Sequence, residues 1–86
     1  MKIFFSSKFE REYKKLPIEI KNLAEKTEDI FRQNPFDDRL KTHKLKGKLR
    51  DFFSFSINYR HRIIFELSND HKIAYFHSIG DHDIYQ

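Results

Sequence analysis

The sequence predicts an α+β fold in which a pair of helices packs on one face of a twisted, four-stranded sheet. Between residues 8 and 34 the apolar residues recur with the period of an α-helix. From Leu40 onward the pattern changes to the period of a β-strand, which is clearest from residue 51. The expected order is strand, helix, helix and then three strands, which lets the sheet and the helices bury their apolar sides together.

The N-terminal part is predicted to form a strand and an antiparallel helical hairpin. Residues 2–6 are apolar and aromatic, as in a short strand. Ser7 and Glu10 have the spacing of a capping box, so a helix is predicted over 8–15. A second helix is predicted over 18–34, where the apolar face repeats for about three to four turns and ends before a proline.

The C-terminal part is predicted to be a three-stranded antiparallel meander. Its strands are expected over 51–57, 60–67 and 72–79, with a tight turn at 58–59 and turn residues at 68–71. The N-terminal strand is expected to join this meander at an edge of the sheet. One face of the sheet would then pack against the helices, and the other would be available for function.

Alternation also sorts individual side chains between the two faces. On the strand predicted over 60–67, Arg60 and Arg62 project together from the side opposite the apolar residues. His61 and His77 are predicted to lie on the apolar side of their strands, and His71 to lie in a turn. No pair of histidines has the HxH or HxxxH spacing of a metal site on one predicted element, so no metal site is expected.

The composition describes one small domain of 86 residues. It contains no cysteine, so disulfides and thiolate metal sites are excluded and a reducing compartment is the simplest interpretation. No apolar run approaches the roughly 18 residues of a membrane span, and the N-terminus lacks a signal-type hydrophobic stretch. We therefore expect a cytoplasmic protein without a membrane partner.

Positive charge is concentrated in one segment, residues 41–62. This segment carries seven Lys and Arg residues against one Asp, a local net charge of +6, while the whole chain has +4. The cations are Lys41, Lys44, Lys46, Lys48, Arg50, Arg60 and Arg62. A concentrated basic patch beside aromatic residues is typical of a protein that binds a polyphosphate such as RNA.

Three sequence stretches, LKGKL, SINYRHRIIF and IGDHDIY, follow the helical hairpin in this order. Together they resemble the RelE/ParE superfamily of small bacterial toxins, nearest to its YoeB-like and YafQ-like mRNA interferases. The resemblance implies a single RelE-like toxin domain over 1–86, part of a type II toxin–antitoxin system. It further implies cleavage of mRNA on the ribosome without a metal or small-molecule cofactor, and inhibition by a cognate antitoxin protein.

The resemblance also implies roles for individual residues. The implied catalytic residues are His43, Arg62, His82 and Tyr85, and the implied phosphate-binding residues are Lys46 and Lys48. The charge pattern adds Lys44, Arg50 and Arg60 as RNA-binding residues. Phe52 is predicted to face the same side as Ser54 and Ser56, where it can stack on a base.

Cleavage by attack of an RNA 2′-hydroxyl requires a base, a positive charge for the phosphate and an acid for the departing oxygen. His43, the group of Arg62 with Lys46 and Lys48, and His82 can fill these roles, since histidine exchanges protons near neutral pH. Which histidine is the base stays open. Asp81 and Asp83 beside His82 add negative charge where RNA would approach.

Two other functions stay open. A ParE-like inhibitor of DNA gyrase would share the fold without catalysis, but it would not need the paired histidines. A basic RNA-binding module without catalysis would use the charged segment for affinity alone. The sequence shows neither helix-turn-helix spacing nor an RNP-type aromatic pair, which disfavours this last function.

Overall fold

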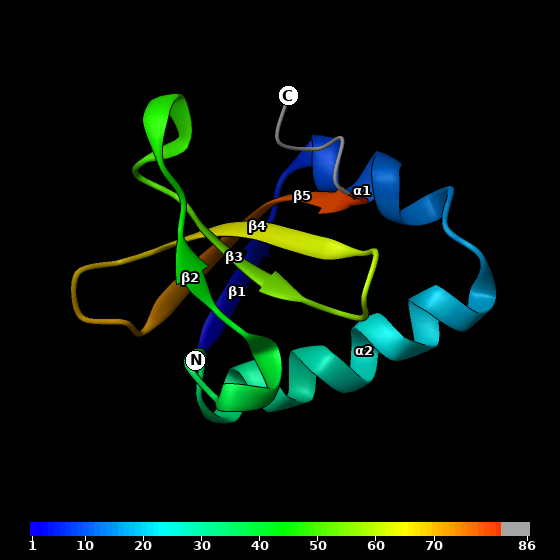
Figure 1. Cartoon of the computed structure of the whole chain (residues 1–86), viewed down its shortest axis with the longest axis horizontal. Helices are drawn as coiled ribbons and strands as arrows, with labels where there is room; N and C mark the ends of the chain where they lie inside the picture. Colours follow the sequence, from blue (N-terminus) through cyan, green and yellow to red (C-terminus); the bar gives the residue numbers. More distant parts are fainter. Residues whose placement is uncertain (82–86) are drawn as a thin grey trace.

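The computed structural model describes residues 1–81, in which two helices pack on one face of a five-stranded sheet (Figure 1). The strands lie in the order β1-β5-β4-β3-β2, and every neighbouring pair is antiparallel except β1 with β5. The elements are β1 (Lys2–Phe5), α1 (Ser7–Lys14), α2 (Ile18–Gln33), β2 (His43–Lys44), β3 (Phe53–Ser56), β4 (Arg62–Leu67) and β5 (Ile73–Gly80), with 3₁₀ turns η1 (Asp38–Leu40) and η2 (Gly47–Leu49).

This architecture confirms the predicted α+β class, both helices and the position of the N-terminal strand at an edge of the sheet. The predicted number of strands is wrong, because the short strand β2 adds a fifth strand beside β3. Strand β2 consists of His43 and Lys44 alone, and two basic residues show no apolar alternation from which a strand could be predicted. Within residues 1–81 no helix is long and apolar enough to cross a membrane.

The core between the helices and the sheet is mainly aromatic. Phe31 of α2 is completely buried, and its ring lies 4.9, 4.9 and 5.1 Å from the rings of Phe55, Phe65 and Phe76. These three rings come from β3, β4 and β5, so a single side chain of α2 joins the three central strands. Edge-to-face and offset contacts of this kind add to the free energy gained from burying the rings.

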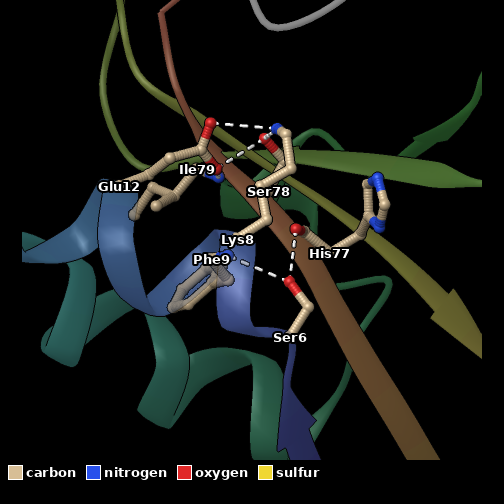
Figure 2. Close-up of polar contacts among 7 residues, drawn as sticks. All are labelled: Ser6, Lys8, Phe9, Glu12, His77, Ser78 and Ile79. Atoms are coloured by element: carbon tan, nitrogen blue, oxygen red, sulfur yellow. Dashed lines mark hydrogen bonds and ion pairs between the residues drawn. The ribbon is translucent and has the colours of Figure 1, made fainter.

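Helix α1 extends the edge of the sheet where β1 ends (Figure 2). Ser6 caps this helix by accepting from the Phe9 amide at 2.9 Å, and its hydroxyl donates to the His77 carbonyl at 2.7 Å. Further along, a carboxylate oxygen of Glu12 accepts from the Ile79 amide at 3.2 Å and the Ser78 hydroxyl at 2.9 Å. The His77 carbonyl and the Ile79 amide of β5 lie beyond the end of β1. The side chains of Ser6 and Glu12 therefore supply the hydrogen-bond partners that a neighbouring strand would otherwise provide.

The cap predicted at Ser7 is therefore wrong by one residue. Ser6 is the capping residue because its extended backbone, at φ −71° and ψ 159°, is the conformation of a residue just before a helix. Its amide also continues the pairing of β1 by donating to the Phe76 carbonyl at 3.0 Å. Ser6 and Ser7 both have a hydroxyl that can cap a helix, and the pairing of β1 with β5 places Ser6 at the capping position.

The connection between β3 and β4 spans residues 57–61 instead of the predicted two-residue turn. The Asn58 side chain organises it by accepting from the amides of Arg60 and His61 at 2.9 and 2.7 Å. Arg60 and His61 consequently belong to the loop. The prediction that Arg60 projects from the strand beside Arg62 is wrong, as is the prediction of His61 on the apolar face.

A bulge in β5 explains the position of His77. Ile64 pairs with Ser78 but the next residue, Phe65, pairs with Phe76, so His77 is an extra residue on β5. As a result, Phe76 and Ile79 both belong to the core although they are three residues apart. His77 is exposed, and its predicted place on the apolar side is wrong.

Candidate functional site

The face of the sheet opposite the helices brings together several of the predicted site residues. Directly opposed residues of an antiparallel pair point to the same side, so His43, Ser54 and Ile64 share this side through their pairing. Alternation along β3 and β4 adds Ser56 and Arg62, which also pair. We call this side the outer face; along β2, β3 and β4 it comprises His43, Phe52, Ser54, Ser56, Arg62, Ile64 and Glu66.

Arg62 is a fixed cation on the outer face. Its guanidinium donates a hydrogen bond to the hydroxyl of Ser56, the residue directly opposite it on β3. On its other side it pairs with Gly80 of β5, which contributes no side chain to the face. Arg62 is half-buried, whereas Arg60 in the neighbouring loop is exposed. A strand residue held in this way can direct its remaining donors at a phosphate.

Sequence reasoning did not identify Ser56 as a partner of Arg62. Alternation placed both side chains on one face, but which residue opposes Arg62 depends on the length of the loop between β3 and β4. The predicted two-residue turn gives a different pairing from the five-residue loop of the structure.

His43 lies at the edge of the outer face, on β2, and is exposed. Its Nδ1 atom is 3.2 Å from the Lys41 carbonyl oxygen. A proton on Nδ1 that is donated to this oxygen leaves Nε2 as the basic nitrogen of the ring. The Cα atoms of His43 and Arg62 are separated by two strand spacings and two residues, about 12 Å in a flat sheet.

Phe52 and His77 meet across the outer face of β4. Their ring centroids are 5.1 Å apart, although Phe52 directly precedes β3 and His77 belongs to β5, on the other side of β4. Phe52 is half-buried and lies on the side that alternation predicts, while Phe53 stacks on the core residue Phe65. The contact with His77 was not predicted, because the bulge that turns His77 out of the core leaves no signal in the sequence.

Three further predicted RNA-binding residues, Lys46, Lys48 and Arg50, are exposed on the turn around η2. This turn projects beyond the sheet on the side away from α2 (Figure 1). Gly47 begins η2 with φ +68°, a conformation that favours glycine. The turn thus carries its cations past the end of the sheet.

The structure separates Lys44 from these cations. Lys44 pairs with Phe53, which faces the helices, and its ammonium lies 5.9 Å from the centre of the Phe53 ring. Lys44 is therefore directed to the helix side of the edge strand, and its neighbour His43 is directed to the outer face.

The predicted site residues His82 and Tyr85 lie outside the described residues. The described part of the chain leaves β5 at Gly80, next to Arg62. Within residues 1–81, no three His, Asp or Glu side chains are grouped so that they could hold a metal ion.

A cleft of 460 Å³ lies between α1 and α2, on the opposite side of the sheet from His43. Phe9, Ala24 and Ile63 contribute apolar surface to it, and Lys14 is the cation that lines it among residues 1–81. Its acidic lining residues are Glu10, Glu25 and Glu28. These carboxylates repel phosphate, so the outer face is the better candidate for binding nucleic acid.

Solved structures of RelE/ParE-type toxins share this fold. The YoeB/ParE toxin from Agrobacterium tumefaciens superimposes with a TM-score of 0.80 and 18% identity over 95% of this chain and 99% of its own. YafQ from E. coli strain BL21(DE3) gives a TM-score of 0.79 and 18% identity, covering 96% of this chain and 94% of its own. The YoeB–YefM complex from Staphylococcus aureus gives 0.75 and 22% identity, covering 95% and 97%.

The chain thus has the fold of the RelE/ParE superfamily, which confirms the resemblance seen in the sequence at the level of fold. YoeB and YafQ toxins are among the structures that it matches. No protein-family model matches the sequence, and no curated protein matches it.

Proposed function

We propose that this chain is the toxin of a type II toxin–antitoxin pair and a metal-independent endoribonuclease that cleaves mRNA on the ribosome. One observation carries the proposal: Arg62, fixed by Ser56, shares the outer face with His43, and the two residues lie near opposite ends of the basic segment 41–62. The fold likeness to YoeB and YafQ toxins supports the same class of activity.

In the proposed reaction, the 2′-oxygen of a ribose bonds to the adjacent phosphorus and the bond from phosphorus to the 5′-oxygen breaks. The products are a 2′,3′-cyclic phosphate and a free 5′-hydroxyl. His43 and His82 carry the two proton transfers, one removing the 2′-hydroxyl proton and the other protonating the 5′-oxygen. Arg62 stabilises the charge that develops on the phosphate oxygens, and Tyr85 contacts the substrate.

The basic residues around this centre bind the rest of the RNA backbone. Lys46, Lys48 and Arg50 lie near one end of β3, and Arg60 lies in the loop at its other end. An RNA strand that follows β3 would therefore meet cations on both sides of Arg62 and His43, and Phe52 would stack on a base between them. Because Lys44 faces the helix side, we expect it to contribute less than these residues.

The proposed partner is an antitoxin with an acidic segment that covers residues 41–62. Among the structures with this fold, the Staphylococcus aureus YoeB is in complex with YefM. An acidic segment on the outer face would neutralise the net charge of +6 and block access to Arg62. A structure of the inhibited complex in which Lys46, Lys48 and Arg62 all stay exposed would contradict this mode of inhibition.

The test is to induce the chain in a bacterial host and to map new RNA 5′ ends on translated messages by primer extension. Growth arrest with cuts inside reading frames is expected from the wild type, and both are expected to disappear in the His43→Ala, His82→Ala double variant and in Arg62→Ala. Arg11→Ala removes an exposed cation of α1, and His71→Asn changes a turn histidine at φ +60°, so both should behave as the wild type.

The outcomes separate the three functions. Arrest that persists in the double variant without any cuts would overturn the nuclease and favour a target such as DNA gyrase. Binding of RNA without arrest or cleavage would favour a basic binding module.

A further inference from the structure

An exposed aromatic pair lies on the outer face near the edge strand β1. Phe4 and Tyr75 are paired across the parallel β1–β5 ladder, and Tyr75 is opposite Glu66 of the outer face. Their rings are stacked, with centroids 5.7 Å apart and planes inclined by 17°. Phe4 is 45% exposed and Tyr75 46% exposed, so much of this stack is in contact with solvent.

The packing of the core does not require this pair. The neighbouring residues Phe5 and Phe76 point to the helix side, where both contact Phe9. Phe4 and Tyr75 are outside the buried core. Within residues 1–81, their rings contact each other and the Lys2 ammonium, which is 5.4 Å from the Phe4 centroid. Two adjacent large rings form a contiguous apolar patch at the surface, a feature that can mark a binding site.

The combination of rings and a cation indicates which ligand. Proteins that bind single-stranded RNA stack bases on exposed aromatic rings and hold phosphates with nearby basic side chains. A stack of two rings ends in outer faces on which a planar base can continue the stack. The Lys2 ammonium, which lies over the Phe4 ring, supplies a cation at the stack, and the basic segment 41–62 contributes positive charge elsewhere on the molecule.

We propose that Phe4 and Tyr75 form a stacking platform for a base of the bound RNA, at a distance from the bond that is cleaved. This inference rests on the proposed function, since it extends the same RNA-binding face. Tyr75 is five residues along β5 from Gly80, the partner of Arg62, which corresponds to about 16 Å. The platform therefore contacts a nucleotide that flanks the reacting one.

Glu66 determines what part of the nucleotide occupies the platform. Its carboxylate lies opposite Tyr75 and repels a phosphate at that position. The base therefore lies on the rings, and the backbone passes on the side of Lys2. An apolar protein partner would instead have to bury Lys2 and Glu66 beside the rings, which is costly when these charges are unpaired.

The experiment measures binding of 2′-O-methyl RNA, which has no attacking hydroxyl, by fluorescence anisotropy at low salt. The probes are a labelled octanucleotide and a labelled dinucleotide that is too short to span from Arg62 to the platform. Phe4→Leu and Tyr75→Leu keep an apolar side chain but remove the ring, and Tyr75→Phe keeps the ring. Ile18→Ala is the control, because it removes an exposed apolar side chain from the start of α2.

We expect each leucine variant to bind the octanucleotide about tenfold more weakly than the wild type, with binding of the dinucleotide unchanged. Tyr75→Phe and Ile18→Ala should bind both probes as the wild type does. The proposal is overturned if the leucine variants bind the octanucleotide with full affinity, or if the wild type binds it no more tightly than the dinucleotide.

Two further readouts separate this inference from the proposed function. Arg62→Ala should weaken both probes, and an unchanged affinity in this variant counts against the proposed RNA site itself. Sedimentation of the same variants tests whether the two rings instead contact another copy of the chain. Self-association that the leucine substitutions abolish, without any effect on RNA, would reassign the rings to contact between copies of the chain and overturn the platform.

Discussion

The guanidinium of Arg62 is hydrogen-bonded to the hydroxyl of Ser56, and the two residues are also direct partners in the β3–β4 ladder. The position of the cation is therefore set by the register of a hairpin rather than by a loop. Arg60, only two residues away, lies in the loop and is exposed. In the proposed site Arg62 therefore stabilises the reacting phosphate, while Arg60 binds the RNA backbone.

Replacing Ser56 by alanine should lower the rate of RNA cleavage about tenfold, because Arg62 loses the hydrogen bond that holds it. The free energy of unfolding should change by about 1 kcal/mol or less, the usual net contribution of one hydrogen bond. Single-turnover cleavage and urea unfolding measure the two effects. Ser56→Thr keeps the hydroxyl and serves as the control, and a cleavage rate that is unchanged in Ser56→Ala would show that Arg62 needs no such support.

Replacing Arg62 by alanine should lower cleavage by about 100-fold or more, the effect of removing a donor that stabilises transition-state charge. The protein should stay folded because the side chain lies on the outer face, opposite the core residues Ile63 and Phe65. Circular dichroism checks the fold. Arg62→Lys keeps the charge but not the planar pair of donors, so its rate should be intermediate. Loss of the folded spectrum in Arg62→Ala would make the residue structural.

Lys46→Ala and Lys48→Ala should each make RNA binding less sensitive to salt. Each phosphate contact to a single strand contributes about 0.7 to the slope of log affinity against log salt concentration. Lys44→Ala should change the slope less, because its ammonium lies over Phe53 on the helix side. Lys26→Ala on α2 is the control for the loss of one exposed charge. An equal change in all four variants would mean that net charge alone sets the affinity.

Glu12 should make the stability of the protein depend on pH in the acid range. Partial burial raises the pKa of Glu12, but hydrogen bonds from Lys8, Ser78 and the Ile79 amide outweigh it, so the pKa lies below its ordinary value of 4.5. A lowered carboxyl pKa stabilises the folded state above the ordinary value, and this contribution disappears as the pH falls through the folded-state pKa.

The measurement is urea unfolding of the wild type and of Glu12→Gln between pH 3 and 7. The variant should be about 1 kcal/mol less stable at neutral pH, a modest loss because about half of the Lys8 side chain is exposed to solvent. The difference should shrink as the pH falls below 4.5. Glu19→Gln, an exposed residue in the first turn of α2, is the matched control. A difference that stays constant with pH would show that the charge of Glu12 does not contribute.

The sequence predicted the parts of the fold that follow from apolar periodicity. The stripe that ends at Phe31 predicted α2 to within one residue, and alternation around Phe55 and Phe65 predicted the faces of β3 and β4. These patterns are visible because the burial of each side chain repeats with the geometry of the element. The placement of Phe52 on the outer face follows from the same alternation.

The parts that were missed depend on how the strands pair and on side-chain hydrogen bonds within a loop. The pairing of His43 with Ser54 makes β2 a strand, and the bulge at His77 is set by how β5 pairs with β4. Neither leaves a periodic pattern. The five-residue loop is selected by the side chain of Asn58, which satisfies two amides at once. The partner of Arg62 follows from that loop and was missed with it.

The parallel pairing of β1 with β5 has a consequence for the time at which the protein completes its fold during synthesis. Lys2 pairs with Ile73, and Ser6 with His77, over a separation of 71 residues. Strand β1 therefore has no partner until β5 has been made. Contacts this distant in sequence form late, because the intervening chain must first be brought together. A chain that has not yet released β5 lacks both Phe76 of the aromatic core and the Gly80 backbone that pairs with Arg62. The outer face around Arg62 is therefore complete only after β5 has joined the sheet, and the proposed activity would require this step.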